Sequence, residues 1–459
     1  MTVSVDTLRQ KTDRFLRGPL YIWALALLTT LTFAFGGEIL FYCAIALLAG
    51  YICAFSDDLL PLAPLFALVY IAPSVRSNPG RSSDSIFSGN SLIFVVIVGA
   101  LIIGCFVYRI IRDRKLYFRR GNKLMSGMLI LCGAYMISGI GSAGYLDVAG
   151  KNLLFALGQC AGILLPYWLI VNGVNWEKAR KDYLPWIGMA MGCVLLAEIF
   201  CIYLINPVLK NGIIYREEIY TGWGMRNNLG CMLAMAIPFA FSIGVHYKKT
   251  VLGILGGAVF LAGVFMTTSR TSAIFGGLAY VGCIALMFLY TEDRKKKLIA
   301  LLVVLGMGVA LLAALHKPLL RLFSQTLDDA HELDSRFDIY KRGLKTFFNT
   351  PIFGSTFYPT AENPAWGWAQ NDVRSILPDR WHNTVVQLLA STGIVGFAAY
   401  CFHRFQTIRM ALAFRGREKW LVVFSALIML LCSLLDCHLF NVGPTLFYSM
   451  SLAFMEKQE

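Results

Sequence analysis

A histidine stands at the mouth of an apolar segment near the carboxyl end of this sequence, where it could accept a proton. The stretch PDRWHNTVVQLL places His382 between Trp381 and Asn383, directly before the apolar residues. Histidine side chains titrate near neutral pH, so one placed here can remove the proton of an attacking hydroxyl. We therefore expect His382 to act as a general base, the alternative being a polar residue at a membrane interface.

Two arginines precede another apolar segment. The stretch YREEIYTGWGMRNNLG contains Arg216, Arg226 and Asn228, just before a predicted helix that begins at Leu229. Guanidinium groups and the free N–H groups of a helix N-terminus together suit phosphate oxygens. Arg226 is therefore a predicted phosphate ligand, whereas Arg216 has two glutamates beside it that can neutralise its charge. The alternative is an interfacial loop with aromatic anchors.

A short turn between two apolar segments carries a further arginine. It reads MTTSRTSAIFGG, in which Arg270 follows Ser269 among other small hydroxyl residues. An arginine at the membrane face is costly unless it snorkels to water or meets an anion. Because the small neighbours leave room for an anion, we interpret Arg270 as a phosphate contact, with a snorkelling arginine as the alternative.

The longest polar stretch runs from His316 to Trp381. In SRFDIYKRGLKTFFN, basic residues that include Arg336 and Arg342 surround apolar residues at helical spacing. The alternative to a substrate contact is an amphipathic helix on the bilayer surface, and Arg336 could also pair with the acidic residues before it. The following stretch, FGSTFYPTAENPAWGWAQND, is rich in Gly, Pro and aromatic residues, which suits a sugar-facing or lid-like loop.

The apolar segments around these residues predict a membrane protein. Of the 459 residues, 57% are hydrophobic and 15% are charged, and the mean hydropathy is +0.62, which is more apolar than a soluble domain. We predict an all-α polytopic membrane protein with about 14 transmembrane helices, in a range of about 12 to 14. The predicted spans are Pro19–Phe35, Ile39–Phe55, Leu59–Pro73, Ser91–Tyr108, Leu124–Ile140, Leu153–Val174, Pro185–Leu204, Leu229–Val245, Val251–Met266, Ser272–Tyr290, Leu298–Leu315, Asn383–Phe402, Trp420–Leu435 and Val442–Met455.

The basic residues predict how these spans are oriented. Most of the 41 Lys and Arg residues fall on one side of the predicted map, the side of the N-terminus. The positive-inside rule then makes both termini cytoplasmic and places the long 316–381 segment outside. By the same map the net charge of +14 lies in the cytoplasmic segments. It is therefore an orientation signal, and we predict no nucleic acid partner.

Other common site signatures are missing from the sequence. The twelve cysteines have no paired CxxC spacing and lie mostly in apolar runs, which favours buried thiols over disulfides or a metal cluster. No HExxH, Walker A, GxGxxG or GxSxG motif is present. We therefore expect no metal and no cofactor, and a lipid-linked activated substrate would have to carry the energy for bond formation.

At these residues the sequence resembles the O-antigen ligase and O-antigen polymerase superfamily of bacterial polytopic glycosyltransferases. The matching pieces are GMRNNLGCMLAMAIPF, TTSRTSAIFGG, SRFDIYKRGLKTFFNTPIFGSTF and WHNTVVQLLASTGIVGFAAY, which agree with the family in order, spacing and predicted side of the membrane. The resemblance implies a GT-C-type fold with a long extracytoplasmic loop that carries short helices. It also implies a metal-independent, inverting transfer of a glycan from a polyprenyl (undecaprenyl) diphosphate carrier to an acceptor hydroxyl, outside the cytoplasmic membrane.

The resemblance also implies roles for individual residues. His382 is similar to the family's essential histidine, which is placed to act as the general base. Arg336 and either Arg226 or Arg216 are similar to the arginines that hold the donor diphosphate, and Arg270 matches the hairpin arginine. We expect further substrate contacts from Ser269, Asn228, Arg342, Asn383 and Trp381.

The predicted spans divide the chain into four parts. The sequence leaves the chemical class of the acceptor open. The parts are the N-terminal helices (1–204), helices with two arginine-bearing outer loops (205–315), the large outer loop (316–381) and the C-terminal helices (382–459). A second lipid-linked glycan as acceptor would make the protein a polymerase, and a lipid, wall polymer or protein would make it a ligase. The alternative function is a transporter or flippase of lipid-linked saccharides, which needs polar residues along the membrane interior. Only Glu198 and Asp436 are acids predicted inside helices.

Overall fold

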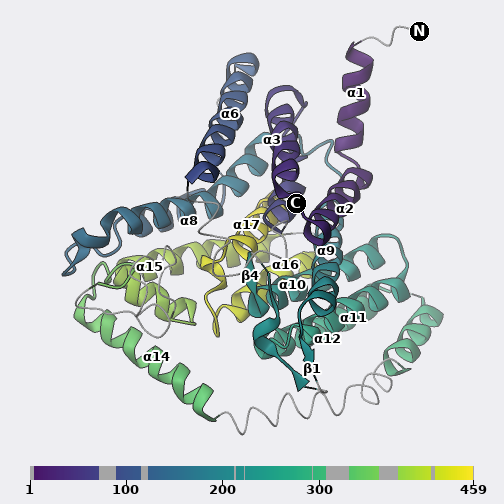
Figure 1. The fold of residues 1–459 in the computed structure, drawn as a ribbon. Coiled ribbons are helices and arrows are strands. Elements are labelled where there is room, and N and C mark those ends of the chain that lie inside the picture. Colours follow the sequence, from purple (N-terminus) through teal and green to yellow (C-terminus); the bar gives the residue numbers. More distant parts are fainter. Residues whose placement is uncertain are drawn as a thin grey trace.

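The computed structural model of the chain is built mainly of helices (Figure 1). It describes residues 5–71, 89–114, 122–210, 213–221, 223–291, 293–306, 330–360, 381–414 and 419–457. The predicted lid-like loop lies mostly outside these residues, as does the end of the predicted span Leu298–Leu315.

The described helices come in two stretches of the sequence, one before and one after a segment of short strands. The first group comprises α1 (Val5–Leu16), α2 (Pro19–Phe35), α3 (Glu38–Phe55), α4 (Leu62–Leu68), the 3-10 turn η1 (Val69–Ile71), α6 (Gly89–Asp113), α7 (Met125–Met136), α8 (Tyr145–Gly173) and α9 (Tyr183–Ile205). The second comprises α10 (Arg226–His246), α11 (Thr250–Met266), α12 (Arg270–Tyr290), an unlabelled helix at 294–306, α14 (Ala330–Asn349), α15 (Thr384–Ala413), α16 (Lys419–Cys432), the 3-10 turn η4 (His438–Phe440) and α17 (Val442–Lys457).

Helix α10 lies at the centre of the packing. It contacts α9, α11, α12, α16 and α17, and in Figure 1 these helices lie around it. Almost every residue between Leu229 and Gly244 is buried, as expected for a helix that is apolar on all sides. Its first residues therefore stand at a fixed position among several neighbouring helix ends.

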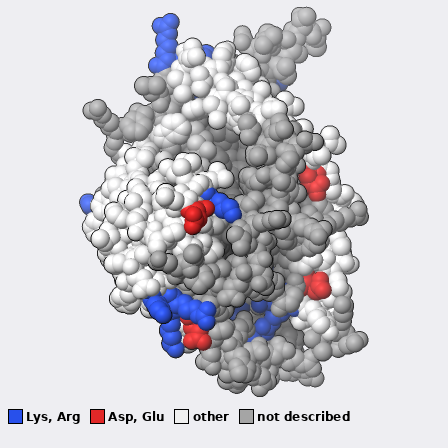
Figure 2. Space-filling model, turned by 60° about the vertical axis from the view of Figure 1, so that its left-hand side comes forward, with Lys and Arg blue, Asp and Glu red and all other residues white. Residues whose placement is uncertain are grey.

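The helices meet the requirements for crossing a membrane. Among the described residues, six are long and apolar enough, and a seventh span results if α2 is counted together with the end of α1. Shorter apolar helices, among them α11 and α16, add to these. The described side chains on the face in Figure 2 are largely uncharged. The chain is thus a multi-pass membrane protein, and the count of about fourteen spans stays a prediction.

Two short β-ribbons interrupt the all-helical pattern that the sequence predicts. Strands β1 (Leu209–Lys210) and β2 (Ile213–Ile214) pair antiparallel, and so do β3 (Tyr220–Thr221) and β4 (Gly224–Met225). Between them lies the 3-10 turn η2 (Arg216–Glu218). Isoleucine, tyrosine and threonine favour strands, and the dipeptide Asn-Gly that follows Lys210 in the sequence is a strong hairpin signal. The ribbons lead the chain into the first turn of α10.

The segment that follows α14 packs against a break in α15 (Thr384–Ala413) at Gly393. Gly393 has a left-handed φ of 63°, and a Cβ there would lie 2.3 Å from the carbonyl oxygen of Ile352. The segment after α14 also pairs with α15, because Ser355 N–H donates to the Ala390 carbonyl at 2.8 Å. The polar helix that the sequence predicts in the long loop is therefore confirmed as α14, and it is fastened to the start of α15.

Candidate functional site

His382 is held in an unusual backbone conformation just before α15. Its φ is 49°, a left-handed value that is uncommon outside glycine and asparagine. The next residue, Asn383, caps α15 by accepting hydrogen bonds from the N–H groups of Val385 and Val386. The preceding residue, Trp381, is buried. An anchored residue on each side fixes where the imidazole projects, and strain of this kind is common at functional sites.

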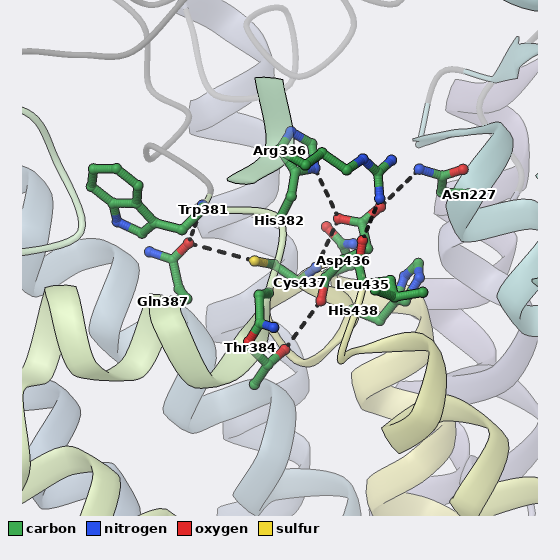
Figure 3. A network of polar contacts seen from close by, with 12 residues as sticks. Asn227, Arg336, Trp381, His382, Thr384, Gln387, Leu435, Asp436, Cys437 and His438 are labelled. Atoms are coloured by element: carbon green, nitrogen blue, oxygen red, sulfur yellow. Dashed lines mark hydrogen bonds and ion pairs between the residues drawn. The ribbon is translucent and has the colours of Figure 1, made fainter. Parts of the chain in front are cut away.

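A carboxylate from another part of the chain meets this imidazole. His382 Nδ1 lies 3.5 Å from Asp436 Oδ1, and Figure 3 shows the two side chains pointing toward each other. The N–H of Cys437 donates to the same carboxylate at 2.7 Å, and Asn227 Nδ2 donates to its other oxygen at 2.9 Å. Asp436 therefore connects the start of α15, the start of α10 and the turn between α16 and α17.

The Asp436 carboxyl stays ionised. Burial alone would raise its pKa, but the contact with His382 and the electrostatic interaction with His438 hold the pKa well below the usual range of a carboxylic acid. The group is only 7% exposed, so its negative charge is weakly screened by water. A buried carboxylate beside one imidazole nitrogen orients the ring, as in the carboxylate–histidine pairs of hydrolytic enzymes.

Arg336 reaches the same cluster from α14. Its Nη1 donates to the carbonyl of Leu435 at 2.9 Å, and Figure 3 shows its guanidinium above Asp436. Four residues later on the same helix, the hydroxyl of Tyr340 donates to the His382 carbonyl at 3.2 Å. The hydrogen bond of Arg336 to Leu435 thus ties α14 to the turn that carries Asp436.

Two more predicted arginines open neighbouring helices. Arg226 is the first residue of α10, and Arg270 is the first residue of α12. The helices touch one turn further on, where a Cβ on Gly230 would lie 2.8 Å from the hydroxyl oxygen of Ser272. Because both helices begin at this level, two arginines and two helix N-termini share one face of the molecule, and such an arrangement favours anions.

The remaining predicted residues have other surroundings. The buried Ser269 hydroxyl donates to Ser272 at 3.0 Å, so it stabilises the hairpin turn. Asn228 Oδ1 accepts from Asn441 and lies 3.1 Å from His438 Nδ1, which joins α10 to η4. Arg216 lies in η2. Arg342 is exposed on α14, about two-thirds of a turn around the helix from Arg336.

The carboxylate of this cluster does not lie where the sequence predicts it. Asp436 was expected inside a helix, but α16 ends at Cys432 and Asp436 lies in the turn before η4. That expectation was wrong because the apolar run continues past the last helical turn. No local pattern marks Asn227, Tyr340 or His438 as part of a site, although His438 is buried beside Asn228. Glu198 is inside α9 as predicted, where it accepts from Trp223.

The fold and the site together define a class of protein: a multi-pass helical membrane protein with arginines and a carboxylate-paired histidine at helix ends. Residues 255–401 match the family described as O-antigen ligase. This match confirms the resemblance to the O-antigen ligase and polymerase superfamily, and the matched segment contains Arg270, Arg336 and His382. No curated protein matches the chain.

Proposed function

We propose that the protein transfers a glycan from a polyprenyl diphosphate donor to an acceptor hydroxyl on the outer face of the cytoplasmic membrane. The observation that carries this proposal is the pairing of His382 with the buried, ionised Asp436. The match to the O-antigen ligase family supports a glycan transfer reaction. The positive-inside rule supports a site on the extracytoplasmic face.

In this proposal His382 is the general base and Asp436 orients it. With Nδ1–H directed to the carboxylate, Nε2 carries the lone pair that accepts the acceptor's hydroxyl proton. As that proton moves, the acceptor oxygen forms a bond to the anomeric carbon, and the bond from this carbon to the diphosphate oxygen breaks. Attack from the side opposite the leaving group inverts the anomeric configuration. The imidazolium that forms is then stabilised by the neighbouring negative charge of Asp436.

The arginines stabilise the leaving group. The bond between the anomeric carbon and the diphosphate breaks heterolytically, so negative charge builds on the phosphate oxygens. Arg336 beside Asp436, together with Arg226 and Arg270 at the starts of α10 and α12, supplies fixed positive charge for that purpose. Permanent guanidinium charges make a metal ion unnecessary, and we propose that the reaction is metal-independent. The partners are the lipid-linked donor and a glycan, lipid or wall-polymer acceptor.

A reconstituted transfer assay tests this function. The full-length protein is incorporated into vesicles with a polyprenyl diphosphate glycan and candidate acceptor glycans or lipids, and products are separated by mass. We expect a new glycosidic bond and release of polyprenyl diphosphate, unaffected by EDTA. Movement of the donor across the bilayer with no new glycosidic bond would contradict the proposal and favour a flippase.

A further inference from the structure

A pocket lined by lysines lies at the opposite end of α11 from Arg270. The cavity has a volume of about 190 Å³ and is lined by residues of the turn before α11, its first turn and the helix at 294–306. We call this cavity the lysine pocket; its lining residues are Lys248, Lys249, Thr250, Val251, Leu252, Lys296 and Ile299.

A tight turn between α10 and α11 presents two of the lysines. Lys249 N–H donates to the Gly244 carbonyl at 2.7 Å, and Lys248 stands at a left-handed φ of 56°. The two helices approach so closely that a Cβ on Gly244 would lie 2.8 Å from the Gly253 Cα. A glycine would fit the position of Lys248 with less strain, so the turn keeps a charged side chain at a conformational cost.

The described part of the chain offers no partner for the charges of the lysine pocket. Among the described residues, no acid or other group pairs with the ammonium groups of Lys248, Lys249 or Lys296. The lining contains no acidic residue. Three like charges around one cavity repel each other, and an anion that entered it would remove this repulsion.

Three of the other four lining residues are apolar, and two of these three are exposed. Leu252 is 60% exposed and Ile299 is 50% exposed. Each helix continues the apolar surface away from the pocket, with Leu255 on α11 and Leu302 on the helix at 294–306 both exposed. A water-soluble anion would gain nothing from this surface, whereas an acyl chain would bury it.

We propose that the lysine pocket binds the headgroup of an anionic phospholipid of the cytoplasmic leaflet, with an acyl chain along Leu252 and Ile299. The basic segments on this side of the chain are the ones that the positive-inside rule places in the cytoplasm. Basic pockets between membrane helices on that side suit anionic lipid headgroups. The inference is independent of the glycan transfer reaction, because it uses none of the residues of the His382 site.

A lipid-binding titration tests the lysine pocket directly. The full-length protein, purified in a neutral detergent, is titrated with fluorescent phosphatidylglycerol and with fluorescent phosphatidylcholine. We expect tighter binding of phosphatidylglycerol. In the triple variant K248Q/K249Q/K296Q this preference should fall by about 100-fold. The triple variant with arginine at the same positions should keep it.

A matched variant separates the pocket from general surface charge. K178Q/R294Q/K295Q removes three basic residues from the same predicted side of the membrane, two of them within two residues of Lys296 but outside the lining. This variant should keep the lipid preference and its thermal stability. Loss of the preference in the control, or its survival in the triple glutamine variant, would overturn the proposal. Inorganic phosphate that competes fully with the lipid would also overturn it, by showing a site for a soluble anion.

Discussion

Two buried aspartates with histidine neighbours lie on opposite predicted sides of the membrane, and they differ in what balances their charge. Asp182, at the start of α9, accepts two hydrogen bonds from Arg180 at 2.9 and 2.8 Å and one from Tyr247 at 2.7 Å. Its histidine neighbour, His246, lies 3.9 Å away. Asp436 accepts from Asn227 and from the Cys437 backbone, and the His382 imidazole lies 3.5 Å from it.

This difference separates a structural carboxylate from a reactive one. A guanidinium keeps its proton at every physiological pH, so Asp182 is neutralised permanently and its histidine neighbour is dispensable. The contact of Asp436 is an imidazole, whose charge changes when a proton arrives or leaves. Around Asp436, therefore, proton transfer from a substrate changes the charge balance of the cluster. Around Asp182 it would not.

The largest difference in transfer rate should be between the variants that lack His382 and His246. His382→Ala should lower the rate of glycan transfer by about 10³-fold, because general base catalysis contributes on this scale. His246→Ala should leave the rate within about twofold, since Arg180 still neutralises Asp182. Initial rates in the vesicle assay measure both. Unchanged transfer by His382→Ala would remove the general-base role.

The same comparison applies to the carboxylates. Asp436→Asn should lower kcat by about 10²-fold, because the amide neither fixes the imidazole tautomer nor stabilises its protonated form. Asp182→Asn should leave kcat of the folded protein nearly unchanged and lower its Tm instead. Equal kcat in the two variants would show that Asp436 is also only structural. Circular dichroism of both variants provides the check on folding.

Local sequence patterns predicted most of the elements that hold the site. Helix α10, helix α12, the beginning of α15 and the polar helix α14 all follow from apolar runs or helical spacing within a single segment. The arginines at the starts of α10 and α12 were recognised because a helix start is also a local signal. Their roles in substrate binding remain predictions.

Contacts between distant segments could not be predicted in the same way. The pairing of His382 with Asp436 joins two stretches separated by all of α15 and α16, and no local pattern encodes which helix ends meet. Asn227 follows Arg226 in the sequence, and its amide binds the distant Asp436. The β-ribbons were not predicted, because hydropathy marks their segment only as a loop between apolar segments; the Asn-Gly dipeptide is nevertheless a hairpin signal.

Replacing Arg336 or Arg180 by lysine should give a smaller difference, in kcat/KM for the donor. Arg336→Lys should lower kcat/KM for the donor by about tenfold, since an ammonium keeps the charge but loses the planar fork that fits phosphate oxygens. Arg180→Lys should leave kcat/KM unchanged and reduce stability, because that fork binds Asp182 and Tyr247, outside the proposed site. Donor titrations with both variants measure the effect. A similar loss of kcat/KM in both would contradict the assignment of Arg336 to the donor.

Acid should weaken the Asp182 cluster over a defined range of pH. Burial raises the pKa of Asp182, but hydrogen bonds from Arg180 and Tyr247 outweigh this effect and lower it from 3.8 to about 2. Above about pH 5 the carboxylate is ionised in both the folded and the unfolded chain, and its contribution to stability, about 2 kcal/mol, is fully present. That contribution is lost progressively as the pH falls from about 5 through the folded pKa of about 2, because the unfolded chain takes up the proton first. Thermal unfolding in detergent at a series of pH values should therefore show a smaller acid-induced fall of Tm in Asp182→Asn than in the wild type. Equal falls would mean that the Arg180 pair contributes no pH-dependent stability, and would weaken the contrast with Asp436.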